Sequence, residues 1–172
     1  MAATAIFLRY GFKKTARAAG VSRQGLYLYF DTKDLLFREA LQYLVSHMIS
    51  TARSVAEDGN LSLRDRLLGV FEAVHGSAFQ SASPEHAFEL LQSAQSAAGA
   101  LLVQLDQDLM RITAALLSEA GVADRWEDAG VTVAELSEQL LMSAKGIKAS
   151  VDTLTAYRER MLTAIRIVTR SP

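Results

Sequence analysis

Residues 16–36 read ARAAGVSRQGLYLYFDTKDLL, and this stretch decides the fold expected for the front of the chain. Gly20 tolerates the left-handed turn between two short helices, and the two alanines before it let those helices cross closely. Ser22 can cap the second helix, because its hydroxyl can accept hydrogen bonds from the amides of the next turn. Leu26 and Phe30 lie one turn apart and would anchor that helix to the core. The pattern predicts a helix-turn-helix, whose second helix fits the major groove of DNA.

The distribution of charge agrees with an anionic partner at the front of the chain. The formal net charge is −1, but residues 1–38 carry seven basic and two acidic side chains. Residues 39–172 carry eleven basic and seventeen acidic side chains. A basic segment on an acidic body indicates binding to an anion such as nucleic acid, although charge alone does not name the partner.

Composition excludes several classes of protein. The chain has 172 residues, of which 50% are apolar and none is cysteine. The lack of cysteine rules out a disulfide scaffold, cysteine-ligated zinc, iron–sulfur clusters and thiol nucleophiles. No apolar run approaches the roughly 18 residues of a membrane span, and the start of the chain lacks the features of a signal peptide. We therefore expect a cytoplasmic protein that has no membrane partner.

Apolar residues at helical spacing extend over nearly the whole chain and predict an all-α fold of about nine helices. After the helix-turn-helix, a long helix is expected between Asp31-Thr32 and Gly59-Asn60. Further helices are predicted over residues 62–79, after Ser83-Pro84, over residues 101–120, and near residues 132–150 and 153–170. Residues 121–131 show no periodicity and are predicted to form a loop. The expected organisation is an N-terminal three-helix DNA-binding domain, residues 1–38, followed by a helical effector-binding and dimerisation bundle, residues 39–172.

The front of the chain resembles a known family. The run from Gly20 to Leu36 is similar to the recognition-helix signature of the TetR family of bacterial transcriptional regulators. Residues 5–12, AIFLRYGF, resemble the first helix of that family and its glycine–aromatic ending. The strong resemblance covers the front of the chain, and beyond it only the helical pattern agrees. It implies a DNA-binding regulator whose helical body binds a small molecule and forms a dimer.

The resemblance also assigns roles to individual residues of the recognition segment. Arg23 and Gln24 would reach base edges, Gly25 would let the backbone approach the DNA, and Leu28 would touch a thymine methyl. The residues expected at the phosphates are Thr15, Ser22, Tyr27, Tyr29 and Lys33. The alternatives left open are a core position for Tyr27 and a solvated surface charge for Lys33.

The second helix departs from the family pattern. Between Thr15 and Ala16 the family has several more residues, so that here only about one turn of helix remains, which is too short to cross a DNA backbone. Two interpretations stay open: a shortened DNA-reading domain, or a sequence from which residues of this helix are missing. The well-formed recognition helix favours the second interpretation.

For the body, the resemblance implies a small-molecule pocket and a dimer interface formed by the last two helices. The candidate pocket residues are Phe71, His75, Phe79, Phe88, Leu91, Met110 and Met142. The candidate interface residues are Leu140, Ala144, Ile147, Tyr157, Met161 and Ile165. For every residue in both sets the alternative is packing in the core of a single chain. An apolar pocket with few polar groups suits a hydrophobic or amphipathic effector.

No motif indicates an enzyme, a metal site or a cofactor. Glu72 and His75 have the spacing of a metal-binding pair, but a di-iron bundle needs a second such motif and two further glutamates. Asp106 and Asp108 are two apart on a helix and face different directions. Phosphate-binding loops and a nucleophile elbow are also missing.

The function predicted from the sequence is a ligand-responsive repressor. It would bind a palindromic, double-stranded operator as a homodimer and be released by a small hydrophobic effector, without a cofactor. One alternative is a helical dimer that binds a small molecule and has lost DNA binding. A small helical enzyme is the other alternative.

Overall fold

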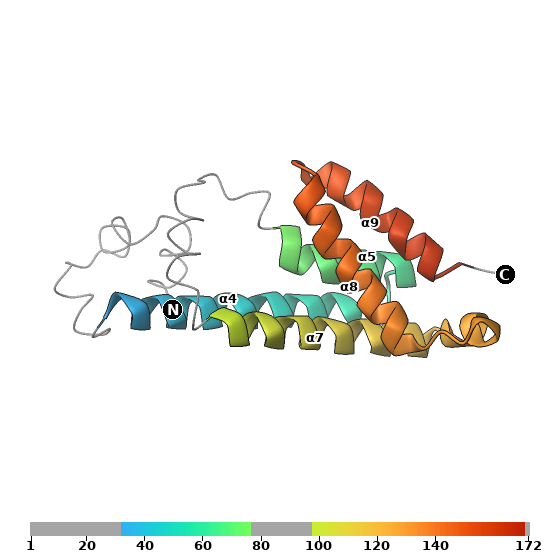
Figure 1. Cartoon of the computed structure of the whole chain (residues 1–172), viewed down its shortest axis with the longest axis horizontal. Coiled ribbons are helices and arrows are strands. Elements are labelled where there is room, and N and C mark those ends of the chain that lie inside the picture. Colours follow the sequence, from blue (N-terminus) through green and yellow to red (C-terminus); the bar gives the residue numbers. More distant parts are fainter. Residues whose placement is uncertain (1–31, 77–97, 171–172) are drawn as a thin grey trace. The chain divides into compact units, whose positions relative to one another are not determined.

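Helices account for the regular structure of residues 32–76 and 98–170, the part of the chain that the computed structural model describes (Figure 1). The elements are α4 (Lys33–Ala56), α5 (Leu63–His75), α7 (Ala98–Glu119), the 3₁₀-helix η2 (Ala123–Ala129), α8 (Val133–Ser150) and α9 (Leu154–Val168). The all-α prediction is confirmed for these residues. They contain six helices, and the count of about nine is not matched. The helices predicted before residue 31 and after Ser83-Pro84 lie outside the described ranges.

The chain divides into two compact units. The first comprises residues 1–47 and 81–104, and its described parts are the N-terminal part of α4 and the first turns of α7. The second comprises residues 48–80 and 105–172 and holds the rest of α4 and α7 together with α5, η2, α8 and α9. The core and the sites described below belong to the second unit.

Side-chain caps define where four of the helices begin. The capping residues are Thr32 before α4, Ser62 before α5, Thr132 before α8 and Thr153 before α9. Thr132 and Glu135 cap each other's amides: Glu135 N donates to Thr132 Oγ1 (3.2 Å) and Thr132 N donates to Glu135 Oε2 (2.8 Å). Each cap satisfies an amide that has no partner inside the helix. The starts predicted near these residues are therefore confirmed.

The core of the second unit forms where α5, α8 and α9 pack together. Apolar residues recur every three or four positions, so each helix turns one side inward. The largest fully buried side chains include Leu67, Phe71, Leu109, Leu117, Leu140, Tyr157, Met161 and Ile165. Burying a side chain of this size stabilises the fold by about 1.5–3 kcal/mol. Gly69 lets α5 approach α4 closely, because a Cβ at this position would lie 2.5 Å from Val55 Cγ1.

The structure places most of the residues predicted for the dimer interface in the core of the single chain. Leu140, Ala144, Tyr157, Met161 and Ile165 have no exposed surface in a single chain. They belong to the stripe on which α8 and α9 pack against each other and against α5, so a second chain cannot touch them. Ile147, the sixth residue of the set, is half-buried.

The loop predicted over residues 121–131 is also incorrect, because η2 spans most of it. Gly121 (φ +60°) and Gly130 (φ +67°) provide left-handed turns on either side of this short helix. Trp126 anchors it to the end of α9, where Trp126 Nε1 donates to Val168 O (2.9 Å). A 3₁₀-helix repeats every three residues, so the search for a longer helical period could not reveal it.

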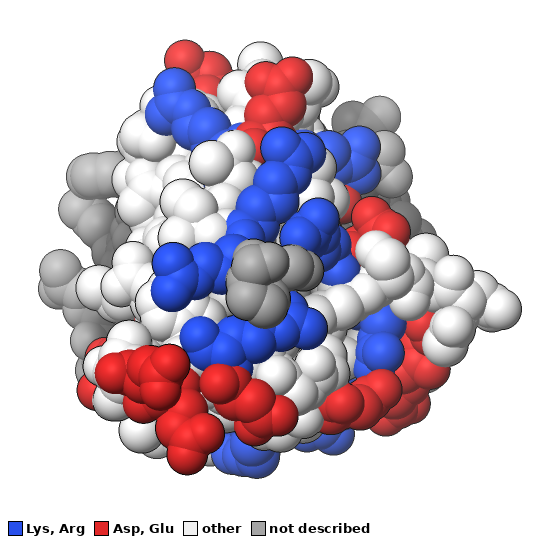
Figure 2. Space-filling model, turned by 90° about the vertical axis from the view of Figure 1, so that its right-hand side faces the viewer, with Lys and Arg blue, Asp and Glu red and all other residues white. Residues whose placement is uncertain are grey.

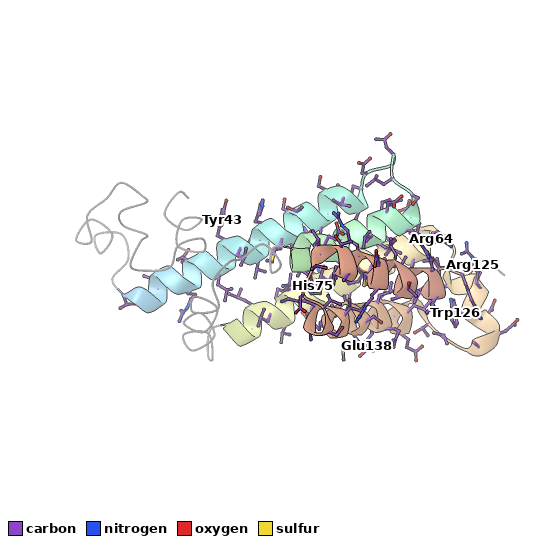
Figure 3. All side chains as sticks on the ribbon, turned by 90° about the horizontal axis from the view of Figure 1, so that it is seen from above. Tyr43, Arg64, His75, Arg125, Trp126 and Glu138 are labelled. Carbon is purple, nitrogen blue, oxygen red and sulfur yellow. The ribbon has the colours of Figure 1, made fainter. Side chains whose placement is uncertain are left out.

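Basic side chains hold the C-terminal end of α9. They gather on the face seen in Figure 2, and Figure 3 places Arg125 and Trp126 at this end, away from His75. Arg64 Nε donates to Thr169 Oγ1 (3.2 Å), and Arg125 Nη1 donates to Thr169 O (3.2 Å). The guanidinium of Arg170 lies 4.3 Å from the centre of the Trp126 ring. Cations are favourable here because the carbonyls at the end of a helix carry partial negative charge.

Within the ranges 32–76 and 98–170, no helix combines the length and the apolar character that crossing a membrane requires.

Candidate functional site

Most of the predicted DNA-contacting residues precede the part of the chain that the structure describes. Thr15, Ser22, Arg23, Gln24, Gly25, Tyr27, Leu28 and Tyr29 all lie before residue 32. Lys33 is the first residue of α4, and the hydroxyl of Thr32 caps this helix by accepting from Leu35 N (3.1 Å). The roles of these residues in DNA binding stay predictions.

The predicted pocket residues do not form a single group. Phe71 and His75 are buried on α5, and Met110 is half-buried on α7. Phe79, Phe88 and Leu91 lie outside the described residues. Met142 is 59% exposed, because its neighbours Leu140 and Leu141 turn the opposite side of α8 inward. Met142 therefore does not line the interior of the bundle.

A hydrogen-bonded pair of aromatic side chains lies in the interior of the second unit. His75 ends α5, and Tyr157 lies in the first turn of α9. His75 Nδ1 and Tyr157 Oη are 2.8 Å apart, and the two rings meet edge to face at 90° with their centres 5.7 Å apart. His75 is 7% exposed and Tyr157 is fully buried. The sequence analysis predicted His75 as a pocket residue and Tyr157 as an interface residue. It did not predict that they contact each other, because spacing along the chain does not reveal contacts between two different helices.

Burial and nearby charges keep this pair uncharged at neutral pH. Burial, followed by the positive charges of Lys148 and Lys145, lowers the pKa of His75 to about 4, while Asp106 opposes this shift. Burial, followed by the negative charge of Glu72, raises the pKa of Tyr157 well above its ordinary value. A neutral imidazole donates from one ring nitrogen and accepts at the other. The pair therefore lies in the core without bringing a buried charge.

The carboxylates considered in the sequence as metal ligands or catalytic groups form ion pairs in the structure. Glu72 pairs with Arg158, whose Nη2 lies 2.9 Å from Glu72 Oε2, and Asp106 pairs with Lys145. Among the described residues, no group of three or more histidine and acidic side chains could hold a metal ion. The hydrogen-bond partner shown for His75 is a phenol, whereas the base of a catalytic triad is oriented by a carboxylate.

Two kinds of comparison with known proteins gave matches: a family model matches the front of the chain, and solved structures resemble its overall fold. Residues 1–40 match the family model for bacterial regulatory proteins of the tetR family. No curated protein matches the chain at a significant level.

Solved structures of three regulators resemble the whole chain. A transcriptional regulator from Rhodococcus sp. RHA1 is 16% identical with a TM-score of 0.68, and the match covers 97% of this chain and 91% of that one. A TetR-like transcriptional regulator from Rhodococcus sp. RHA1 is 21% identical with a TM-score of 0.62, covering 99% and 93% of the two chains. The TetR family transcriptional regulator PfmR from Thermus thermophilus is 18% identical with a TM-score of 0.55, covering 99% and 96%. At these identities the likeness shows a shared fold.

Residues 1–40 thus match the tetR family model, and the whole chain shares its fold with solved regulators, two of which are described as TetR-like or TetR family. The family match over residues 1–40 agrees with the resemblance found in the front of the sequence.

Proposed function

We propose that this chain is a ligand-responsive repressor that binds a palindromic operator as a homodimer and is released by a small hydrophobic effector. The observation that carries the proposal is the family match over residues 1–40, because it covers the basic segment and the predicted helix-turn-helix. In this proposal residues 1–38 read DNA, and residues 39–172 bind the effector and form the dimer. The protein would act in the cytoplasm.

The DNA-reading part of the proposal rests on the recognition segment. Arg23 and Gln24 would contact base edges, supported by Gly25 and Leu28, because the first residues of a recognition helix face the major groove. The residues proposed at the phosphates are Thr15, Ser22, Tyr27, Tyr29 and Lys33. The start of α4 supports the role of Lys33, since the free amides at a helix N-terminus add to the attraction for an anion.

For the dimer, we propose the outer faces of α8 and α9 in place of the buried stripe. Met142 on α8 is 59% exposed and Ile167 on α9 is 61% exposed. A partner that covered these two side chains would remove apolar surface from water. A two-fold dimer also matches the symmetry of a palindromic operator.

For the effector, we propose the interior next to Phe71 and the His75–Tyr157 pair. Apolar walls with one or two fixed hydrogen-bonding groups are typical of small-molecule sites. Phe79, Phe88, Leu91 and Met110 remain in the proposed lining, and Met142 is removed from it. The effector would release DNA only to the extent that it binds the DNA-free conformation more tightly.

The test is to select duplexes from a random DNA pool with the whole protein and to measure their affinity as a function of salt. A palindromic consensus is expected. Arg23→Ala should weaken binding to this consensus by about 1–3 kcal/mol, whereas Lys33→Ala should weaken binding to all DNA and reduce the salt slope by about one. Arg111→Ala, an exposed arginine on α7 outside the proposed DNA-reading and dimer surfaces, is the control. A pool that yields no consensus, or an unchanged affinity in Arg23→Ala, would contradict the proposal.

The second candidate is a helical dimer that binds a small molecule and has lost DNA binding. The short segment between Thr15 and Gly20 favours it, because one turn of helix is too short to cross a DNA backbone. Salt-dependent binding to any duplex DNA would exclude this candidate.

A further inference from the structure

An open groove of about 470 Å³ lies between the last turns of α4 and the middle of α7. Its floor is apolar and includes Ile112, Ala115 and Leu116 of α7. Its rim carries the three arginines Arg53, Arg66 and Arg111. The groove shares no residue with the His75–Tyr157 pair, so it is a separate place in the same unit.

One of the three arginines is fully used by the fold. Arg66 Nε donates to Ala56 O (2.7 Å), and its two terminal nitrogens bind the carboxylate of Glu119 at 3.2 and 3.0 Å. Only 15% of its side chain is exposed. Arg66 therefore fastens the end of α4 to α7 and has little capacity left for a ligand.

The other two arginines share a single carboxylate. Arg111 Nη1 donates to Asp108 Oδ1 at 2.7 Å, and Arg53 Nη2 lies 3.6 Å from the same oxygen, beyond hydrogen-bond distance. Their side chains are 65% and 55% exposed. A guanidinium has five N–H donors, so this pair keeps most of its donors available.

The charge of the groove is uneven along its length. Three arginines and three carboxylates line the groove, so its formal charge is zero, and the two exposed guanidinium groups meet a single carboxylate at the Asp108 end. Arg66 and Glu119 neutralise each other, and Glu57 also lines the groove. The attraction for an anion therefore arises at the Arg53–Arg111 end and not from the total charge.

We propose that this groove binds a small amphipathic carboxylate. The carboxylate would accept hydrogen bonds from Arg53 and Arg111, because guanidinium groups match the planar geometry of a carboxylate. The apolar body would lie over Ile112, Ala115 and Leu116. The volume is within the range of small-molecule sites, about 300–1,000 Å³.

A ligand in this position would connect α4 to α7. Because α4 begins directly after the recognition segment, restraint of its last turns would couple the groove to DNA affinity. This regulatory consequence rests on the proposed function, whereas binding in the groove does not. Any coupling must be reciprocal, so operator DNA would change the affinity for the carboxylate by the same factor.

The experiment titrates naphthoate, a flat aromatic carboxylate, into the full chain without DNA and follows the methyl signals of Ile112 and Ala115 by NMR. Saturable shifts at both methyls are expected. The double variant Arg53→Gln/Arg111→Gln should weaken binding about tenfold or more, because it removes two charge-assisted hydrogen bonds. Ala115→Trp should block the groove to a similar extent. Arg160→Gln and Gln107→Trp, at exposed positions outside the groove, should bind as the unmodified chain does.

Naphthylmethylammonium, a cation with the same ring system, is the matched ligand and should not shift these methyls. Shifts of equal size with the cation would overturn the assignment to an anion. An unchanged affinity in the double variant, or shifts elsewhere that leave Ile112 and Ala115 unmoved, would overturn the site. Thermal unfolding of each variant separates loss of binding from loss of the fold. If naphthoate binds as expected but no DNA consensus can be selected, the repressor function fails while the groove stands.

Discussion

Both faces of the α8–α9 pair carry large apolar side chains, but the chain itself covers only the inner face. On the inner side Leu140, Tyr157 and Met161 have no exposed surface. On the outer side Met142 and Ile167 expose more than half of theirs. The inner face is mostly apolar, whereas the outer side mixes these two residues with charged side chains such as Glu138 and Lys145, and the two sides differ in what packs against them.

This difference shows why an apolar stripe alone does not identify an interface. A helix gives the same spacing of three or four residues to a stripe that packs inside the chain and to one that meets a partner. The position of α5 decides between them, because α5 packs on α9 and also meets α8. The residues predicted to form the interface are the ones that the chain uses for its own core.

The largest effect should come from a matched pair of truncations on the two faces of α9. Met161→Ala should lower the free energy of unfolding by about 2–5 kcal/mol, because it leaves a cavity in the core. Ile167→Ala should change it by no more than about 0.5 kcal/mol at a protein concentration where the chain is monomeric. Urea denaturation of both variants measures the difference. Equal losses would show that the two faces are not distinct.

The stability of the fold should also depend on pH, because His75 is buried at the inner face. Its pKa is lowered to about 4 in the fold, first by burial and then by Lys148 and Lys145 against Asp106, from 6.5 in the unfolded chain. Between these values the unfolded state binds more protons, so stability falls as the pH drops from about 6.5 to about 4. The full loss is on the order of 3 kcal/mol.

The measurement for His75 is urea denaturation at neutral and at mildly acidic pH. His75→Gln should flatten this part of the profile, because glutamine does not titrate. The carboxyl groups of Glu119 and Glu135 also have lowered pKa values, so their stabilisation is lost as the pH falls in both proteins. Parallel profiles for the variant and the unmodified chain would refute the role of His75.

The smallest effect on stability is expected from charges on the outer face. The double variant Met142→Glu/Ile167→Glu should leave the unfolding of the single chain within about 0.5 kcal/mol of its original value. It should nevertheless convert the proposed dimer to a monomer, because like charges would meet across the two-fold axis. Sedimentation velocity measures this change, with Ser118→Glu on α7 as the control. Persistence of the dimer in the double variant would place the interface elsewhere.

Local signals predicted the helices well. The sequence placed helix starts at Thr32, at Ser62 and near residues 132 and 153, and the structure shows a side-chain cap at each, since a cap depends on a few neighbouring amides. The sequence pattern did not predict the 3₁₀-helix within residues 121–131, because η2 is held by the contact of Trp126 with the end of α9. The sequence also did not predict the arginines at the rim of the groove, because Arg53 and Asp108 come together from two different helices.

By itself, the sequence determined the helical class, the helix starts and the resemblance of the front segment to TetR regulators. These features depend on residues within a few positions of one another, where backbone geometry sets the contacts. Only the tertiary structure decided that Tyr157 bonds to His75, that the predicted interface stripe is core, and that Met142 points outward. These outcomes depend on which helix packs against which, and side chains brought together from distant helices leave no regular spacing along the chain.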